Sequence, residues 1–458
     1  MLGRIGAVLL AGAISAAAQT VDLTITWIGQ SCFVLKSARG PTVVTDPPVA
    51  SVGYTLPPLT ADAVTVTHNH TDHNNVASVT GATVIDGRPV TSRQQMNAGG
   101  MTFTLVPGFH DNTNGTQRGP NTIVRWTQAG LNIVHLGDFG QDQFTDAQLA
   151  DLQNIDILFV PAGGFFTVTP AQAAAFVAKL KPHIAILMHY KTALGGPAQL
   201  AGLPDAADPF APITYKPATA VVNAAGLPSG TEVWVMQPAA DSTAVNGASY
   251  LAGLPVAPGS IVSVFGSYGK SQSAGAASYP LPGKLGDTEV QVGGVAAPLY
   301  YVSPAQINFQ APSGLGAGQS LVDVRIGGQS VSKGVLTMVP SAPGLFVAAN
   351  SDFRVNSTAQ PAKRGEVLHI FATGQGAVTP PVADGAAAGP TLSKSVAMPN
   401  VFLGGQQMQV LFSGLAPGLV GLWQIDIAIP SDGPSGSMLP LLVESGLRSN
   451  SITVAVSR

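Results

Sequence analysis

The sequence is poor in charged residues and in cysteine. Lysine, arginine, aspartate and glutamate make up only 10% of the 458 residues, and the net charge is −3. No basic run is present, so the sequence offers no electrostatic surface for nucleic acid or for an anionic membrane. Cys32 is the only cysteine, which excludes an internal disulfide. The fold must therefore depend on core packing and on any metal that it binds.

Glutamate is absent between Val21 and Gly230, so a protein acid or base in that stretch must be Asp, His or Tyr. The chain is rich in other residues, with 53 Gly, 36 Pro and 45% hydrophobic residues. This balance is typical of short strands joined by many turns, and we expect a β-rich protein. The length predicts two or three domains.

The amino terminus has the pattern of a secretory signal peptide. Arg4 is followed by an apolar run from Ile5 to Ile14 and by small residues up to Ala18. The run is shorter than the roughly 20 residues that span a bilayer, which argues against the alternative of a membrane anchor. We expect residues 1–18 to be cleaved, the protein to be secreted or periplasmic, and no membrane span to remain.

Residues 21–237 alternate apolar runs with turns and two predicted helices. One helix covers about Thr145 to Leu152, and the other runs from its N-cap Thr169 to Lys181, where a proline follows. We therefore predict one α/β domain over this range.

After Pro238 no helical period persists, and Gly and Pro recur about every 8 to 12 residues, as in β-sandwiches. Three segments also recur in the same order after about 106 to 118 residues. They are Gly259–Gly266 with Gly365–Ala372, Val290–Gly294 with Val401–Gly405, and Gln306–Phe309 with Gln424–Ile427. This repeat predicts two tandem β-sandwiches, over 240–348 and 349–458.

The predicted sandwiches resemble immunoglobulin-like modules of the IPT/TIG kind. More closely, residues 240–458 resemble the Solibacter-type C-terminal domain of exported acidobacterial proteins, through phrases such as Val302–Gln310 and Ser413–Ile425. That family has no assigned chemistry. The sandwiches could be spacers, substrate-binding modules or domains that contact a cell surface or polymer.

The stretch Val64–Asn75, VTVTHNHTDHNN, contains three of the eight histidines of the chain. Its ligand-type residues are His68, His70, Asp72 and His73. The alternative is a solvated polar turn. A site for two metal ions would also need ligands from other parts of the chain, because side chains from one loop cannot surround two ions alone.

Three later apolar runs end close to a ligand-type side chain, as this one does. The residues concerned are His110, Asp138 and His189. Because strand ends deliver side chains to one rim of a sheet, we expect all seven residues to converge. For seven residues together, a set of unrelated structural histidines and loop aspartates is the weaker interpretation.

Six segments together resemble the metallo-β-lactamase fold, with the ascorbate-6-phosphate lactonase-like hydrolases as the closest branch. They are Trp27–Phe33, Thr45–Pro47, Thr67–His73, His135–Asp138, Val160–Gly164 and Met188–Tyr190. The resemblance covers about 25–237. It implies an αββα sandwich with two divalent ions, zinc or alternatively manganese or iron, at one edge.

The resemblance also implies a ligand set. His68, His70 and His110 would hold the first ion, Asp72, His73 and His189 the second, and Asp138 would bridge them. Asp46 matches the carboxylate that braces the histidine loop in this family.

Some residues near the motifs have open roles. Related sequences often have histidine where this chain has Gln30, so the function of that position is in doubt. His135, next to Asp138, could support a ligand or contact substrate, and we prefer these roles to that of a ligand. His183 and His369 are expected to be structural.

The implied chemistry is hydrolysis of an ester, lactone, amide or phosphodiester bond in a small-molecule substrate by a metal-bridging hydroxide. Asp72 is the predicted proton acceptor or donor as well as a ligand, and Tyr190 or His135 could stabilise the oxyanion. One alternative is a non-catalytic exported binding protein with structural metals. Another is a di-iron redox protein, which the lack of a dinucleotide or flavodoxin-like motif disfavours.

Overall fold

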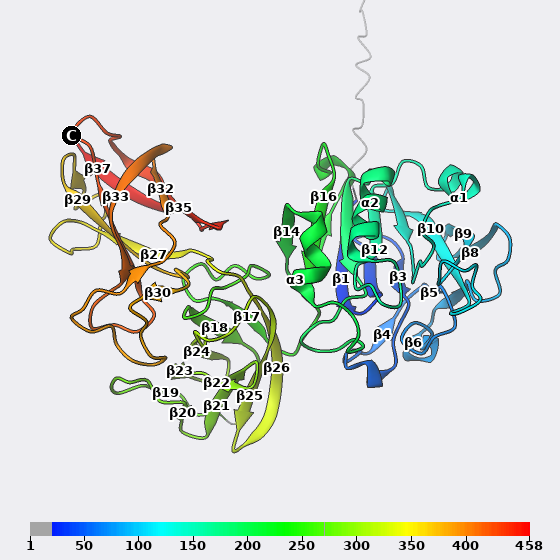
Figure 1. Cartoon of the computed structure of the whole chain (residues 1–458), viewed down its shortest axis with the longest axis horizontal. Helices are drawn as coiled ribbons and strands as arrows, with labels where there is room; N and C mark the ends of the chain where they lie inside the picture. Colours follow the sequence, from blue (N-terminus) through cyan, green and yellow to red (C-terminus); the bar gives the residue numbers. More distant parts are fainter. Residues whose placement is uncertain (1–20, 270) are drawn as a thin grey trace, which may run out of the picture.

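The computed structural model describes residues 21–269 and 271–458, and it has an N-terminal domain of strands and helices followed by a C-terminal half of strands (Figure 1). The predicted signal peptide, 1–18, lies outside the described residues. No helix in the described part of the chain is both long and apolar enough to cross a membrane.

The first sheet of the N-terminal domain has six strands in the order β15-β1-β2-β3-β5-β7. They are β1 (Leu23–Gly29), β2 (Cys32–Ser37), β3 (Thr42–Thr45), β5 (Ala63–Val66), β7 (Thr83–Asp86) and β15 (Thr219–Val222). Strands β3, β5 and β7 are parallel to one another, so their carboxyl ends lie at the same edge.

The second sheet has eight strands in the order β14-β16-β13-β12-β11-β10-β9-β8. They are β8 (Gln94–Ala98), β9 (Met101–Phe109), β10 (Pro120–Gln128), β11 (Leu131–His135), β12 (Ile157–Pro161), β13 (Ile184–Met188), β14 (Ile213–Lys216) and β16 (Glu232–Met236). β11, β12 and β13 are parallel, and every residue of β12 and β13 is buried, as expected for central parallel strands. β10 is antiparallel to both β9 and β11, so β9 and β11 run in the same direction.

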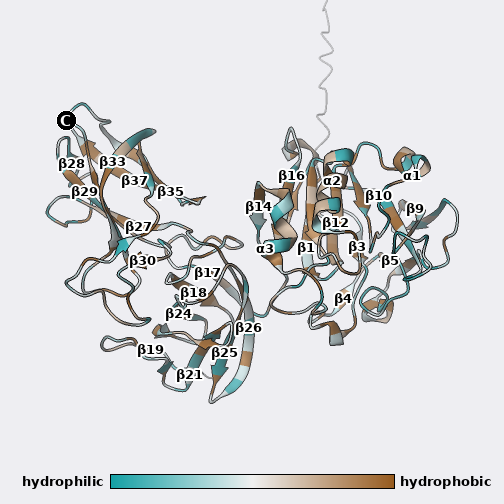
Figure 2. Ribbon diagram, in the orientation of Figure 1, coloured by the Kyte–Doolittle hydropathy of each residue, from teal (hydrophilic) through white to brown (hydrophobic). Residues whose placement is uncertain are grey.

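The two sheets face each other across an aromatic core. The ring centroids of Phe33, on β2, and Phe159, on β12, are 4.3 Å apart, and those of Trp27 and Tyr190 are 5.2 Å apart. All four side chains are fully buried, and each contributes roughly 1.5–3 kcal/mol through burial. Figure 2 shows that hydrophobic residues are concentrated on these strands. The core fixes the two sheets relative to each other, and with them the strand ends that carry the site.

Both helices expected from the sequence are present. α1 (Asp146–Asp151) and α2 (Pro170–Leu180) begin with capping boxes in which Thr145 and Thr169 are the N-caps. A third helix, α3 (Leu203–Ala207), packs beside α2. The buried residues of α2 and α3 join the core of the eight-stranded sheet.

The expected helical layer on the outer face of the six-stranded sheet is not found among the described residues. That face is covered by short elements instead, namely η1 (Ala50–Val52), β4 (Leu59–Thr60), η2 (Val76–Ser78) and β6 (Val79–Thr80). The physical reason is the sequence that supplies this cover, which has no helical period and contains two Pro-Pro pairs, at 47–48 and 57–58. The αββα expectation is therefore wrong for this layer.

The first part of the C-terminal half is a sandwich of two sheets, β17-β18-β24-β23-β19 and β20-β21-β25-β26 with β22 at the side. Its strands are β17 (Thr243–Asn246), β18 (Ile261–Phe265), β19 (Ala274–Gly275), β20 (Lys284–Leu285), β21 (Thr288–Val292), β22 (Val295–Ala296), β23 (Leu299–Val302), β24 (Gln306–Gln310), β25 (Gly318–Ile326) and β26 (Gln329–Met338). One apolar core joins the two sheets.

The second part forms one connected set of eleven strands around its own core. They are β27 (Gly344–Ala349), β28 (Ala362–Lys363), β29 (Val367–Thr373), β30 (Val378–Thr379), β31 (Lys394–Ser395), β32 (Asn400–Leu403), β33 (Gln406–Leu415), β34 (Trp423–Ala428), β35 (Gly436–Ser445), β36 (Leu447–Arg448) and β37 (Ile452–Ser457). β27 pairs with β29, so the expected boundary at 348/349 cuts through a strand. The two cores instead divide between Met338 and Gly344.

The repeat found in the sequence has a structural counterpart. β18 pairs with β24 in the first part, and the equivalent strands β29 and β34 pair in the second. Both Gly-Gly pairs turn a hairpin with positive φ at each glycine: Gly293 and Gly294 between β21 and β22, and Gly404 and Gly405 between β32 and β33.

We predict that residues 21–237 fold on their own, because the core of this domain consists of residues between Leu23 and Met236. A purified 21–237 fragment should unfold in one cooperative transition followed by far-UV circular dichroism. The full chain, measured in parallel, is the control. A fragment that binds hydrophobic dyes and shows no cooperative transition would contradict this domain boundary.

Candidate metal centre

The seven predicted ligands come together at one edge of the two sheets. His68 follows β5 of the first sheet, while His110 follows β9 and His189 follows β13 of the second. Asp138 lies three residues after β11. Because these strands run in parallel directions within their sheets, their carboxyl ends deliver the side chains to the same place.

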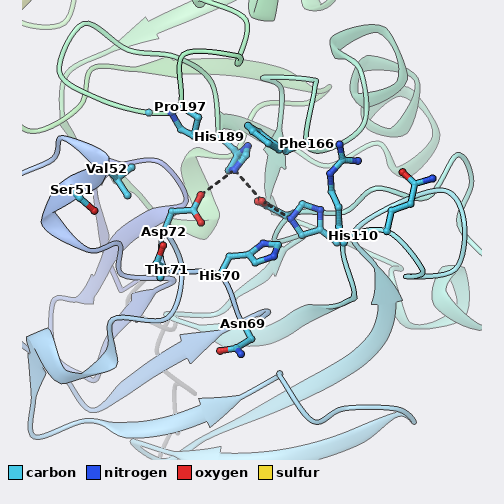
Figure 3. Close-up of a pocket in the computed structure, with 14 residues that line it drawn as sticks. Ser51, Val52, Asn69, His70, Thr71, Asp72, His110, Phe166, His189 and Pro197 are labelled. Carbon is cyan, nitrogen blue, oxygen red and sulfur yellow. Dashed lines mark ion pairs between the residues drawn. The ribbon is translucent and has the colours of Figure 1, made fainter.

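Atoms of the seven predicted ligands form two close groups, and Asp46 makes a third with two of these residues, His68 and His73. One consists of His68, His70 and His110, and the other of Asp72, His73, Asp138 and His189. Within each group, one ligand atom from every residue lies within 4.8 Å of the others. Figure 3 shows His70, His110, His189 and Asp72 pointing toward a common space.

The Asp138 carboxylate contacts both groups. Its Oδ2 lies 3.1 Å from Nε2 of His110 and 3.0 Å from Nε2 of His189. Its Oδ1 lies 3.3 Å from Nε2 of His73, and the side chain is only 2% exposed. Asp138 therefore occupies the position between the two groups that the sequence assigned to a bridging ligand.

Asp46 orients two of the histidines from behind. Its carboxylate accepts hydrogen bonds from the amide of Thr67 (3.0 Å), the hydroxyl of Thr67 (2.5 Å) and Nδ1 of His73 (2.9 Å). The Thr67 hydroxyl oxygen in turn lies 3.0 Å from Nδ1 of His68. Because the Thr67 hydroxyl donates its hydrogen bond to Asp46, its oxygen can accept from Nδ1 of His68, and Nδ1 of His73 donates directly to Asp46. The Nε2 lone pairs of both histidines are then available to a metal ion. The structure thus brings Asp46 to the bracing position.

Gln30 connects two elements of the site. Its Nε2 donates to Oδ2 of Asp72 at 3.0 Å, and its carbonyl oxygen accepts from the amide of His189 at 3.2 Å and from Nε1 of Trp27 at 3.1 Å. The side chain is fully buried. At the position left in doubt by the sequence, the glutamine therefore fixes the carboxylate of one predicted ligand and the backbone of another.

Glycine is required at two contacts with the ligand backbones. A Cβ at Gly140 would lie 2.3 Å from the carbonyl carbon of His110, and one at Gly163 would lie 2.0 Å from the carbonyl oxygen of His189. Both distances are below any real Cβ contact, so larger residues would displace the ligands.

The pKa values of the site histidines depend on burial and on the charges that surround each ring. Burial lowers the pKa of the His189 imidazole, but the Asp138 carboxylate outweighs burial and raises this pKa to about 9. For His73, too, the neighbouring carboxylates outweigh burial, and the pKa of the imidazole is well above its usual value. For His68 and His70, burial and neighbouring imidazoles lower the pKa. Without metal, the carboxylates of Asp138 and Asp72 therefore favour the protonated forms of His73 and His189.

Several buried polar atoms point to a missing partner. Nε2 of His68, Nε2 of His73 and Oδ1 of Asp138 are buried without a hydrogen-bond partner among the described residues. Such atoms cost free energy unless something binds them. They belong to imidazole and carboxylate groups, the donors that zinc and related divalent ions prefer. The residues therefore fit divalent metal ions.

A pocket of about 650 Å³ opens onto the two groups. Besides the ligand-type residues His70, Asp72, His110, Asp138 and His189, its lining comprises Ser51, Val52, Asn69, Thr71, Gln117, Arg118, Phe166, Gly196 and Pro197 (Figure 3). Asn69 and Thr71 lie within the histidine motif, whereas no sequence signal marks Gln117, Arg118 or Phe166, whose segments have no periodicity or motif.

Two predicted catalytic residues do not line the pocket. His135 is fully buried, with Nε2 3.0 Å from the carbonyl oxygen of Ser31 and Nδ1 accepting from the amide of Gly137. Tyr190 is also fully buried, and its hydroxyl donates to the carbonyl oxygen of Met236 at 3.4 Å. Both side chains point into the core, so the expected substrate or oxyanion contacts are wrong. The alternative role for His135, support of the site, is compatible with its place beneath Asp138.

Thr67 and Asn121 belong to the site although sequence reasoning missed them. Oδ1 of Asn121 accepts from the amide of Asp138 at 2.9 Å, and its Nδ2 donates to the carbonyl oxygen of Leu136. Asn121 thus fixes the turn that presents Asp138. Thr67 stands inside the histidine motif, but only the fold reveals that its hydroxyl faces Asp46.

Comparisons with known proteins agree with this geometry. A family described as the β-lactamase superfamily domain matches residues 24–189. A UPF0173 metal-dependent hydrolase from Methanoculleus marisnigri is 30% identical over 190 residues, which cover 37% of this chain and 82% of the relative. A protein of the same name from Myxococcus xanthus is 32% identical over 224 residues, covering 42% and 77% of the two chains.

A solved structure from Thermotoga maritima, named as a member of the metallo-β-lactamase superfamily, is 28% identical, with a TM-score of 0.37 over 47% of this chain and 98% of that one. Both sequence relatives are matched over most of their own length. Through its N-terminal domain, the chain belongs to the UPF0173 family of metal-dependent hydrolases, which has the metallo-β-lactamase fold.

Proposed function

We propose that the protein is an exported hydrolase that uses two divalent metal ions, with zinc as the first candidate. His68, His70 and His110 would hold one ion, Asp72, His73 and His189 the other, and Asp138 would bind both. The observation that carries this proposal is the convergence of seven ligand-type side chains in two close groups, with buried donor atoms that lack protein partners.

Divalent ions held by these residues would supply a nucleophile from water near neutral pH and would polarise the bond to be cleaved. The protein contributes orientation and proton transfer. Asp72 is suited to the second task because it lines the pocket and is 20% exposed, whereas Asp138 is buried. The hydrogen bond from Gln30 holds the Asp72 carboxylate in one orientation, so that its free oxygen can accept or return a proton.

The pocket favours a small-molecule substrate. Its volume of about 650 Å³ lies in the usual range for small ligands. The bond types that this chemistry cleaves are esters, lactones, amides and phosphodiesters. A lactone would agree with the resemblance to the ascorbate-6-phosphate lactonase-like branch.

Export and the role of the C-terminal half are further parts of the proposal. The leader pattern in residues 1–18 supports a secreted or periplasmic location. The two sandwiches, as immunoglobulin-like modules, would attach the enzyme to a cell surface or polymer. A non-catalytic binding protein with structural metals is the second candidate, but the pocket that opens onto the ligand groups favours catalysis.

The first prediction concerns activity. Metal-restored full-length protein should hydrolyse at least one member of a panel with an ester, a lactone, an amide and a phosphodiester. His110→Ala should lower kcat/KM at least about 100-fold, since it removes one ligand of the proposed centre. His183→Ala is the matched control, because His183 bonds the carbonyl oxygen of Pro228 and takes no part in the ligand groups. Absence of turnover, or equal rates for the two variants, would contradict the enzymatic proposal.

The second prediction concerns metal affinity. Asp46→Asn keeps the size of the side chain but cannot accept from Thr67 and from His73 with the same strength, so His68 and His73 lose their fixed orientation. We expect the affinity for zinc, measured by competition with a chromogenic chelator, to fall about 10- to 100-fold. Asp62→Asn is the control, since Asp62 bonds an amide on the exposed edge of the sheet. Equal affinities for the two variants would argue against the bracing role.

The third prediction concerns Gln30. Gln30→Met preserves the length of the side chain and removes the donor to Asp72, so kcat should fall about tenfold while KM changes little, because hydrogen bonds to charged groups contribute about 1.5–3 kcal/mol. Gln30→His restores a donor and should recover part of the rate. An unchanged kcat in Gln30→Met would show that Asp72 needs no such restraint.

A further inference from the structure

The pocket contains a cation that the proposed hydrolysis does not use. Among the described residues that line it, Arg118 is the only lysine or arginine. The two acidic residues of the lining, Asp72 and Asp138, are both proposed metal ligands. Arg118 is therefore the charge left for recognition of a substrate.

The loop that carries Arg118 is held in one conformation by a buried carboxylate. Asp111 accepts hydrogen bonds from the amides of Thr113, Gly115, Gln117 and Arg118, at 2.7–3.0 Å, and from the Thr113 hydroxyl. Arg118 thus projects from a loop that is ordered before any ligand binds.

The Arg118 side chain is oriented but only partly engaged. Its Nη2 donates to the carbonyl oxygen of Phe165 at 3.1 Å, and its guanidinium carbon lies 5.8 Å from the centre of the Phe166 ring. Other arginines, such as Arg88 and Arg93, form ion pairs with aspartates. Arg118 forms none with any carboxylate in the described part of the chain, and most of its five N–H donors lack a protein partner there.

These contacts allow two interpretations. Arg118 could serve only as a clamp that ties its loop to the loop of Phe165. A clamp needs the one hydrogen bond to the Phe165 carbonyl, and neutral side chains could form it. A permanent charge without a counter-charge, held over a pocket, is better explained by an anionic ligand, because guanidinium binds carboxylate and phosphate through paired hydrogen bonds.

We propose that Arg118 binds an anionic group of the substrate, a carboxylate or a phosphate, while the adjoining part of the substrate packs against Phe166. This proposal names the substrate class of the site and so rests on the proposed function. The anion would lie at the rim formed by Arg118 and Phe166, and the bond to be cleaved would lie at the metal ligands of the same pocket.

The test compares two chromogenic esters on the metal-loaded full chain: p-nitrophenyl butanoate, which is neutral, and the mono-p-nitrophenyl ester of glutaric acid, which carries a carboxylate. Arg118→Gln keeps a donor for the Phe165 carbonyl and loses the charge. It should raise KM for the acidic ester about tenfold relative to the neutral ester. Arg118→Lys should recover part of this preference. Arg93→Gln, which removes a charge outside the pocket, should leave it unchanged.

A binding measurement separates this proposal from the proposed hydrolysis. Calorimetric titration with glutarate, and separately with inorganic phosphate, should show at least one anion bound about tenfold more weakly by Arg118→Gln than by the native protein. The anion with the larger loss identifies the group. If the native protein hydrolyses no member of the substrate panel above but this loss is seen, the proposed hydrolysis fails and the anion site stands. Equal changes of KM for both esters, or anion binding that is the same in both proteins, would overturn the proposal and leave Arg118 as a clamp.

Discussion

The buried carboxylate of Asp138 is the constraint around which the N-terminal domain is organised. A charge that is only 2% exposed is stable only if opposite charges or strong donors surround it. Here His73, His110 and His189 approach within 3.0–3.3 Å, and they come from both sheets. The same carboxylate can be neutralised by protons on the imidazoles or by cations between them. Folding thus creates a site that requires positive charge. Metal ions that supplied this charge would also make the site able to catalyse hydrolysis.

Hydrogen bonds around the site hold three residues whose backbone conformations are strained. Asp46, Gln30 and His189 all have positive φ, which is unfavourable by about 1–3 kcal/mol for residues with a side chain. Each is held by several bonds: Asp46 by Thr67 and His73, and Gln30 by Asp72, Trp27 and the amide of His189. Strain at three positions is therefore concentrated where the ligands need exact orientation.

The sequence predicted the convergence of the ligands because each one follows an apolar run, and parallel strands end at a common edge. It also predicted α1, α2 with its N-cap Thr169, and the paired repeats of the C-terminal half, which depend on local residue chemistry. It failed for His135 and Tyr190, because adjacency to a ligand does not reveal whether a side chain points to solvent or to the core. It could not find Arg118 or Phe166, since loop residues carry no period and meet only in the folded chain. The outer helical layer was implied by the family resemblance alone, although the segments that cover that face have no helical period, and the boundary near Gly344 leaves no local signal.

The distribution of the ligands over two sheets also bears on how the chain stays folded. With a single, buried cysteine the described chain has no covalent link between distant segments. Ions held by residues from His68 to His189 would join β5 of one sheet to β9, β11 and β13 of the other, and so close long chain segments much as disulfides do. The centre would then act as a reversible cross-link, whose presence depends on the supply of metal ions rather than on redox conditions.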